Sequence, residues 1–210
     1  STLVVKFFKF PVICIILGLF SLIFVELDRR VYERHIFNNS GSNIEIIKSI
    51  RPSKEFVIIG HGFAGSKEMM RQIAYDVANA GSNAVLFDFI GHGSNQRKLV
   101  NQPTEITGTT QQLVNQLSDI IKFVYEKFGN EIIISLVGHS MASDIVIRAS
   151  ADERVKSVIA ISPYSTGITK YFPKDLLLIS GQFENHLRSH ALQMVKTFKP
   201  EVSENTEYAD

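Results

Sequence analysis

The stretch with the clearest chemistry in this sequence is Gly138-His139-Ser140-Met141-Ala142, where a serine lies between two small residues. A strand-like apolar run precedes it and a helix-like segment follows it, so the serine is predicted on a sharp strand-to-helix turn. Such a turn lifts the Ser140 hydroxyl above a sheet, and nearby backbone requires small residues two positions before and after it. The amide of Met141, at the helix start, then points toward an oxyanion forming on an acyl group. This arrangement is typical of a nucleophilic serine, and the alternative is a serine that only caps a helix.

A glycine-rich turn, residues 60–65 (GHGFAG), follows an earlier apolar strand. Such a turn lets backbone amides face a substrate, and the amide of Phe63 is the predicted second donor to the oxyanion. An ordinary strand-to-helix loop is the alternative. A phosphate-binding loop is disfavoured because no Gly-Lys-Ser/Thr sequence ends this turn.

A third stretch, residues 88–94 (DFIGHGS), follows the next predicted strand. Taken in order, residues 61–63, 88–94 and 138–142 resemble the α/β-hydrolase superfamily, and within it small serine esterases of the cinnamoyl-esterase and acylglycerol-lipase type. The resemblance covers about residues 44–190. It implies hydrolysis of a small acyl ester or thioester without a cofactor, and structural roles for Asp88 and His92.

The resemblance also implies an acid and a histidine that follow the serine in the chain. The acid normally follows the strand after the cap region, and here Glu184 holds that position, in the turn after the predicted strand at residues 175–180. A glutamate is chemically adequate, because the acid must fix the tautomer of an imidazole and stabilise its protonated form. The alternative is a solvent-exposed loop residue.

The histidine is harder to place. In the family it follows one further strand, whereas here His190 is the last histidine and no apolar strand follows the helix predicted at residues 186–198. The sequence is therefore expected to be C-terminally incomplete, lacking the last strand and helix, with the base beyond Asp210. Within the chain, His190 and, less favourably, His186 are the candidate bases, and a helix-surface position is the simplest interpretation of His190.

The elements that must position these residues are alternating strands and helices. Strands are predicted at residues 44–50, 56–59, 84–89, 131–137, 155–162 and 175–180, and helices at residues 66–80, 113–128, 141–149 and 186–198. This alternation indicates an α/β fold with a mostly parallel, doubly wound sheet, within a hydrolase domain at residues 31–210. The short interval between residues 162 and 175 predicts a minimal cap or none, and an open apolar cleft near Tyr164, Tyr171 and Phe172.

The N-terminal segment, residues 1–30, differs from the rest. Its uncharged run at residues 10–25 would reach about 24 Å as a helix, slightly less than a bilayer core of about 30 Å. A membrane anchor is predicted, and a cleaved signal or a buried hydrophobic helix are the alternatives. The expected location is a bacterial inner membrane with the domain outside the cytoplasm.

Composition excludes several functions. The 210 residues include 22 Lys and Arg against 21 Asp and Glu, and this balance argues against nucleic acid as the main partner. The single cysteine, Cys14, rules out an internal disulfide and a cysteine-cluster metal site. The resemblance gives no metal role to His61, His92 or His139.

Three functions are therefore compatible with the sequence. The first is a serine hydrolase of carboxylic esters or thioesters that acts through an acyl-enzyme on Ser140. The second is a catalytically inactive binding protein with the same fold. The third is acyl transfer or perhydrolysis at the same serine, which this fold also supports.

Overall fold

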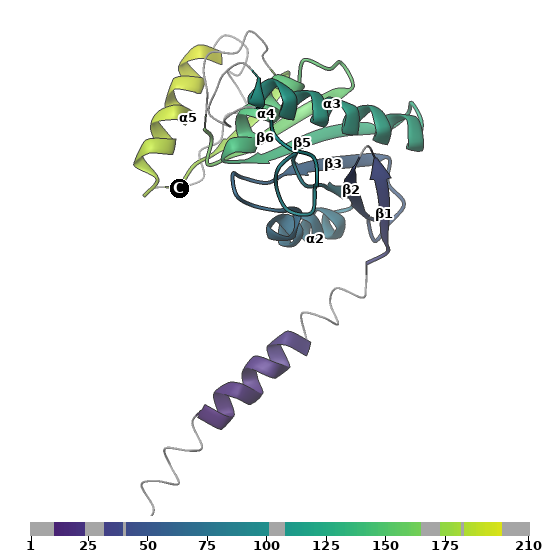
Figure 1. The fold of residues 1–210 in the computed structure, drawn as a ribbon, viewed down its shortest axis with the longest axis vertical. Helices are drawn as coiled ribbons and strands as arrows, with labels where there is room; N and C mark the ends of the chain where they lie inside the picture. The colour runs from purple at the N-terminus through teal and green to yellow at the C-terminus, as the bar shows by residue number, and fades with distance from the viewer. Residues whose placement is uncertain are drawn as a thin grey trace, which may run out of the picture. The chain divides into compact units, whose positions relative to one another are not determined.

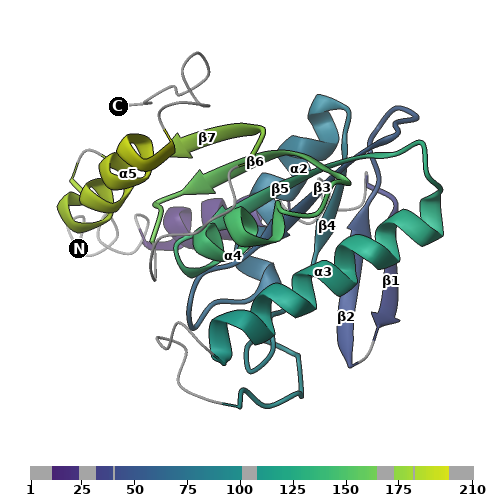
Figure 2. The same ribbon diagram turned by 90° about the horizontal axis from the view of Figure 1, so that it is seen from above.

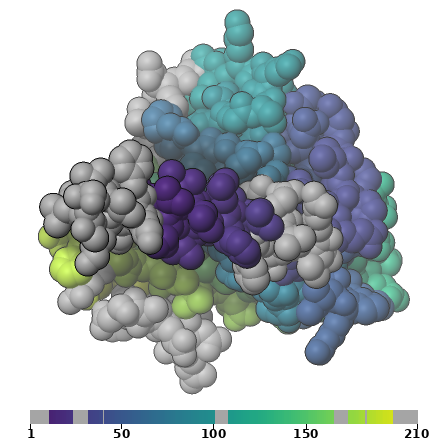
Figure 3. Space-filling view, turned by 90° about the horizontal axis from the view of Figure 1, so that it is seen from below, coloured from purple at the N-terminus to yellow at the C-terminus, as the bar shows by residue number. Residues whose placement is uncertain are grey.

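The computed structural model describes residues 11–23, 32–39, 41–100, 108–164, 173–181 and 183–198. The chain divides into two compact units, residues 1–33 and 34–210. In the first unit, residues 11–23 form a helix whose side chains are all exposed (purple in Figure 3). Within the described part of the chain, no helix is long and apolar enough to cross a membrane, so the predicted transmembrane helix is not found there. The predicted cellular location stays a prediction.

A seven-stranded sheet forms the centre of the second unit, with the strand order β1-β2-β4-β3-β5-β6-β7. The strands are β1 (Arg34–Asn39), β2 (Ser42–Ile47), β3 (Glu55–Gly60), β4 (Asn83–Leu86), β5 (Ile133–His139), β6 (Val155–Ile161) and β7 (Asp175–Ile179). The strands β3 to β7 pair in parallel, whereas β1 and β2 form an antiparallel hairpin that joins the sheet at β4. The predicted α/β architecture with a mostly parallel sheet is confirmed.

The helices cover both faces of this sheet. They are α2 (Arg71–Ala80), which follows the 3-10 turn η1 (Lys67–Met70), α3 (Thr109–Phe128), α4 (Met141–Ala149) and α5 (Asn185–Phe198). Figures 1 and 2 place α3 and α4 on one face and α2 on the other, which confirms the doubly wound arrangement.

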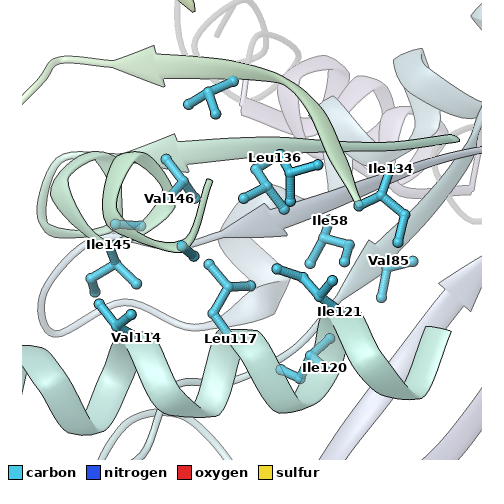
Figure 4. Close-up of a cluster of buried hydrophobic side chains, with 14 of the residues drawn as sticks. Ile58, Val85, Val114, Leu117, Ile120, Ile121, Ile134, Leu136, Ile145 and Val146 are labelled. Atoms are coloured by element: carbon cyan, nitrogen blue, oxygen red, sulfur yellow. The ribbon is translucent and has the colours of Figure 1, made fainter. Parts of the chain in front are cut away.

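The main hydrophobic core lies between the sheet and the helices α3 and α4. Aliphatic side chains of the central strands, such as Ile58 and Leu136, meet Leu117 and Ile121 of α3 and Ile145 of α4 (Figure 4). All five are buried, and burial of each such side chain stabilises the fold by roughly 1.5–3 kcal/mol. The packed core therefore holds the sheet in place, including the carboxyl ends of β3, β5, β6 and β7.

Two local details differ from the sequence-based expectations. Strand β1 was not predicted, because its residues lack a regular apolar alternation; an ion pair between Arg34 Nε and the buried Glu45 of β2 (2.8 Å) holds it instead. The helix expected from residue 66 begins as a 3-10 turn and becomes α-helical only at Arg71. At the start of this turn, the amide and the ammonium of Lys67 are both bound by Asp88, which is 21 residues away in the sequence.

The connection from β6 to β7 spans residues 162–174 and is too short to fold into a cap domain, as predicted. Residues 165–172, which include Tyr171 and Phe172, lie outside the described residues. The open cleft predicted beside them stays a prediction.

Candidate active site

Ser140 lies at the junction between β5 and α4 with φ 53° and ψ −114°. A non-glycine residue in this region is strained by roughly 1–3 kcal/mol and persists only where its surroundings hold it. Here the Ser140 amide donates to the carbonyl of Ile161 at 2.9 Å, and its carbonyl accepts from both the amide and the hydroxyl of Ser143. The position of Ser140 is therefore fixed from the neighbouring strand β6 and from the first turn of α4.

The two small residues that flank Ser140, Gly138 and Ala142, are each required for a different steric reason. A Cβ at Gly138 would lie 2.4 Å from the carbonyl oxygen of Ala142 and 2.8 Å from Cγ2 of Val146, so only glycine fits there. Ala142 is fully buried, and its Cβ would lie 3.0 Å from a Cβ placed at Gly60 on β3. Alanine is therefore accommodated at this turn because the neighbouring strand carries a glycine opposite it.

The glycine-rich loop after β3 lies directly against the nucleophile. A Cβ at Gly62 would lie 3.3 Å from Cβ of Ser140, and the loop turns back through a hydrogen bond from the Gly65 amide to the Gly62 carbonyl (3.1 Å). The next residue, Phe63, exposes its ring and places it edge-on to His92, with the centroids 5.6 Å apart.

Met141, the other predicted oxyanion donor, is the first residue of α4. The amides at a helix start have no acceptor within the helix, and the helix dipole favours negative charge there. The residues Phe63 and Met141 therefore lie in the two segments that flank Ser140, where the sequence predicted them.

A buried carboxylate holds the base of this loop. Asp88 accepts hydrogen bonds from the amide and the ammonium of Lys67 (2.8 and 2.7 Å) and from the amide of Ser94 (3.0 Å). Burial opposes its ionisation, but these donors outweigh burial and hold the pKa of Asp88 below its ordinary value. Asp88 thus fixes the start of η1, immediately after the glycine-rich loop.

His61 is fully buried and has both ring nitrogens engaged. Nδ1 donates to the carbonyl of Gly62 (2.8 Å), and Nε2 accepts from the amide of Phe89 (3.0 Å). Burial is the main reason that the pKa of His61 is lowered, so the ring is neutral. His61 therefore supports the loop and has no nitrogen left for a substrate. Among the described residues, no group of three or more His, Cys, Asp or Glu side chains could hold a metal.

The predicted acid, Glu184, lies in the turn after β7. Its carboxylate accepts the hydroxyl of Ser162 (2.8 Å to Oε2 and 3.0 Å to Oε1) and the amide of Gly181 (3.0 Å). The Ser162 hydroxyl is the main cause that lowers the pKa of Glu184, followed by the Gly181 amide, with a smaller contribution from the nearby imidazole of His139. Glu184 is therefore an ionised carboxylate at neutral pH.

The candidate bases lie on α5. The ring of His190 lies 5.3 Å from that of Tyr164 and 4.7 Å from that of His186, between ring centroids. Burial, and then the neighbouring His186, lower the pKa of His190, which favours the neutral form that a base requires.

A chain of contacts links α5 to Ser140. The amide of Tyr164 donates to the hydroxyl of Ser143 (2.8 Å), which in turn donates to the carbonyl of Ser140. Across the described ranges, neither His190 nor His186 forms a hydrogen bond with the hydroxyl of Ser140 or the carboxylate of Glu184. The structure brings Gly62, the neighbour of Phe63, against Ser140 and leaves the base unassigned.

The comparison with protein families decides how this arrangement is classified. Residues 55–198 match the family of the alpha/beta hydrolase fold. The chain belongs to this family. A search of curated protein sequences finds no match to it.

Several solved structures resemble this α/β hydrolase over most of the length of the chain. TT1662 from Thermus thermophilus is 13% identical with a TM-score of 0.65, covering 85% of this chain and 90% of that chain. XC6422 from Xanthomonas campestris, described as an α/β serine hydrolase without lid, is 14% identical with a TM-score of 0.65, covering 84% and 83%. The esterase Pf2001 from Pyrococcus furiosus is 17% identical with a TM-score of 0.65, covering 85% and 81%. At these identities the likeness establishes the fold.

One residue at the site of this α/β hydrolase was not found by sequence reasoning. Ser162 directly follows β6, is 8% exposed, and has a positive φ of 48°. A serine at a strand end is a common feature, and nothing in the local sequence indicates that its hydroxyl meets Glu184. The signal exists only in the pairing of β6 with β7.

Proposed function

We propose that this α/β hydrolase is a serine hydrolase that cleaves carboxylic ester or thioester bonds through an acyl-enzyme on Ser140. The observation that carries this proposal is the strained turn at Ser140, held from β6 and α4 and facing the glycine-rich loop. Backbone strain of this kind is concentrated at functional sites. The esterase Pf2001, which has the same fold, supports an ester substrate.

The reaction follows from the positions of these residues. The Ser140 hydroxyl attacks the acyl carbonyl carbon, its proton passes to a base, and the amides of Phe63 and Met141 stabilise the oxyanion. The tetrahedral intermediate expels the alcohol or thiol, which takes the proton from the base. Water then attacks the acyl-enzyme and releases the acid. Glu184 would orient the base imidazole and stabilise its protonated form.

The base itself has two candidates. One is His190, whose pKa is lowered by burial toward the neutral form and whose ring lies 5.3 Å, between centroids, from that of Tyr164. The other is a histidine beyond Asp210, which the family resemblance implies. The two candidates give different results in one experiment.

The experiment is active-site labelling of the 210-residue chain with a fluorophosphonate, followed by intact-mass measurement. The Ser140→Ala variant is the control, and circular dichroism confirms that both proteins are folded. One adduct on the wild type and none on the variant is the expected result. The His190→Ala and His186→Ala variants then test the base. A folded wild type that gains no adduct contradicts the proposal for this chain.

A catalytically inactive binding protein is the second candidate function. The same labelling experiment distinguishes it from the first function. In that case the reagent leaves the wild type and the Ser140→Ala variant equally unmodified, although both are folded.

A further inference from the structure

The nucleophile and the acid are joined through two consecutive residues at the end of β6. The carbonyl of Ile161 accepts the amide of Ser140 at 2.9 Å. The next residue, Ser162, donates its amide to the carbonyl of Ile179 at the end of β7 (2.7 Å) and its hydroxyl to Glu184. The relative positions of nucleophile and carboxylate are therefore set by a short, continuous hydrogen-bonded path.

The backbone at Ser162 is shaped for this contact. Its φ of 48° lies in the left-handed region, which is uncommon for a residue other than glycine, asparagine or aspartate. Ser162 is also buried, so this strained backbone lies inside the fold and not in an exposed loop. A strained backbone that presents a polar group to a site residue points to a role at that site.

The turn that carries Glu184 is folded back on itself. The Glu184 amide donates to the carbonyl of Gly181 (3.1 Å), and the Gly181 amide donates to Oε2 of the same glutamate (3.0 Å). A Cβ at Gly181 would lie 3.3 Å from both Cγ and Cδ of Glu184, so the side chain lies closely over the turn. This geometry uses the length of a glutamate, because an aspartate is one methylene shorter.

The two carboxylate oxygens of Glu184 are used unequally. Among the described residues, Oε2 accepts the Gly181 amide and the nearer contact of the Ser162 hydroxyl, whereas Oε1 accepts only the longer contact of that hydroxyl, at 3.0 Å. A carboxylate has about four acceptor positions. Oε1 therefore keeps capacity to accept an imidazole N–H.

We propose that Ser162 is the positioning residue for the acid, and that its hydroxyl, with the Gly181 amide, holds the Glu184 carboxylate so that Oε1 accepts the N–H of the base imidazole. Ser162 only donates a hydrogen bond and transfers no proton. The inference rests on the proposed function, because it assigns Glu184 the role of the acid. His139 is the other titratable side chain whose charge acts on this carboxylate.

Two variants distinguish the contribution of the Ser162 hydroxyl from that of its strained backbone. Ser162→Gly removes the hydroxyl and relaxes the left-handed backbone, so the variant is not destabilised by strain. Ser162→Asn keeps a side-chain donor, and asparagine tolerates a positive φ. Ser180→Ala is the matched control, because Ser180 follows β7 and its buried hydroxyl has no hydrogen-bond partner among the described residues.

The test measures kcat and KM for hydrolysis of p-nitrophenyl acetate over a range of pH, the rate of fluorophosphonate labelling, and the carboxyl ¹³C titration of Glu184 by NMR. We expect Ser162→Gly to lower kcat about tenfold with KM within about twofold, the loss of one hydrogen bond to a charged group. Its Glu184 pKa should rise toward the ordinary value. Ser162→Asn should recover most of the loss, and Ser180→Ala should match the wild type.

Three outcomes overturn the inference. If Ser162→Gly matches Ser180→Ala in kcat, its hydroxyl does not position the acid. If Ser162→Asn stays as slow as Ser162→Gly, the hydrogen-bond donor is not what matters. If the folded wild type is neither labelled at Ser140 nor active, the proposed function fails and the catalytic role of Ser162 fails with it. A labelled wild type with an unaffected Ser162→Gly variant instead overturns only the role of Ser162.

Discussion

The two sides of the candidate site are built in different ways. The nucleophile side consists of backbone and small residues: Ser140 sits on a strained turn between Gly138 and Ala142, and Gly62 lies against it. The acid side consists of the longer side chain of Glu184 on a turn that is largely exposed. The first is fixed by close packing, which leaves little room for added atoms, whereas the second is fixed by a few hydrogen bonds. Added atoms at Gly138 and Gly60 should therefore lower stability, whereas substitutions at Gly62 and on the acid side should appear in catalysis and pH dependence.

The largest effect is expected from Gly138→Ala. The added Cβ would lie 2.4 Å from the backbone carbonyl of Ala142, which cannot move without displacing α4. We expect a loss of about 3 kcal/mol or more in the free energy of unfolding, at the upper end of overpacking effects. Urea denaturation followed by circular dichroism measures it, with Gly129→Ala as a control whose new Cβ meets nothing within 4 Å, so that any loss there comes from its positive φ, which Gly138 does not share. Equal losses in the two variants would show that the turn at Ser140 is not closely packed.

The next largest effect is expected from Gly60→Ala, a substitution that tests the contact between β3 and α4. In Gly60→Ala the new Cβ would lie 3.0 Å from Cβ of Ala142 and 3.1 Å from the ring of Phe89. We expect a loss of about 1–3 kcal/mol in the free energy of unfolding. In the background of Ala142→Gly the same change should cost less, and a double-mutant cycle measures the difference. Strictly additive losses would mean that the two residues do not compete for one space.

A smaller effect is expected from Gly62→Ala, and it should appear in catalysis rather than in folding. The added Cβ would lie 3.0 Å from Nδ1 of His139 and 3.3 Å from Cβ of Ser140, so the loop must shift by a few tenths of an ångström. Oxyanion donors act only at close range, and we expect kcat for p-nitrophenyl acetate to fall about tenfold or more. The melting temperature should change little. A variant with unchanged kcat would indicate that this loop does not supply the oxyanion donor.

The smallest effect concerns the acid side, through Glu184→Gln. The folded-state pKa of Glu184 is lowered, chiefly by the Ser162 hydroxyl, so its contribution to stability is present above the unfolded-state pKa and is lost as the pH falls through the folded-state pKa. The melting temperature of the wild type should exceed that of the variant slightly at pH 7, and the gap should close in acid. Differential scanning calorimetry at several pH values measures it. A gap that is constant with pH would show that the carboxylate charge is not stabilised by this turn.

The sequence was most informative where structure depends on local pattern. The strand before Ser140 and the helix after it were predicted within two residues, because apolar periodicity and a strand-to-helix glycine are local signals. Glu184 was predicted as the acid from the family resemblance, and the structure places it in the turn after β7. Strand β1 was missed because its residues lack an apolar alternation and it forms by pairing with β2, and Ser162 was missed because its contact with Glu184 depends on which strand lies beside β6. Pairing between strands is the information that the pattern of one segment does not contain.

Because both ring nitrogens of His61 are engaged, the glycine-rich loop after β3 should become less stable in acid. A protonated imidazole could no longer accept the amide of Phe89, and its positive charge would be buried. Burial lowers the pKa of His61 in the folded state. As the pH falls through the ordinary histidine pKa, the unfolded chain therefore binds a proton at His61 and the folded chain does not. Stability from this group is complete above that pKa and declines as the solution becomes more acidic. Acid should thus loosen the loop beside Ser140 independently of the ionisation state of the catalytic base.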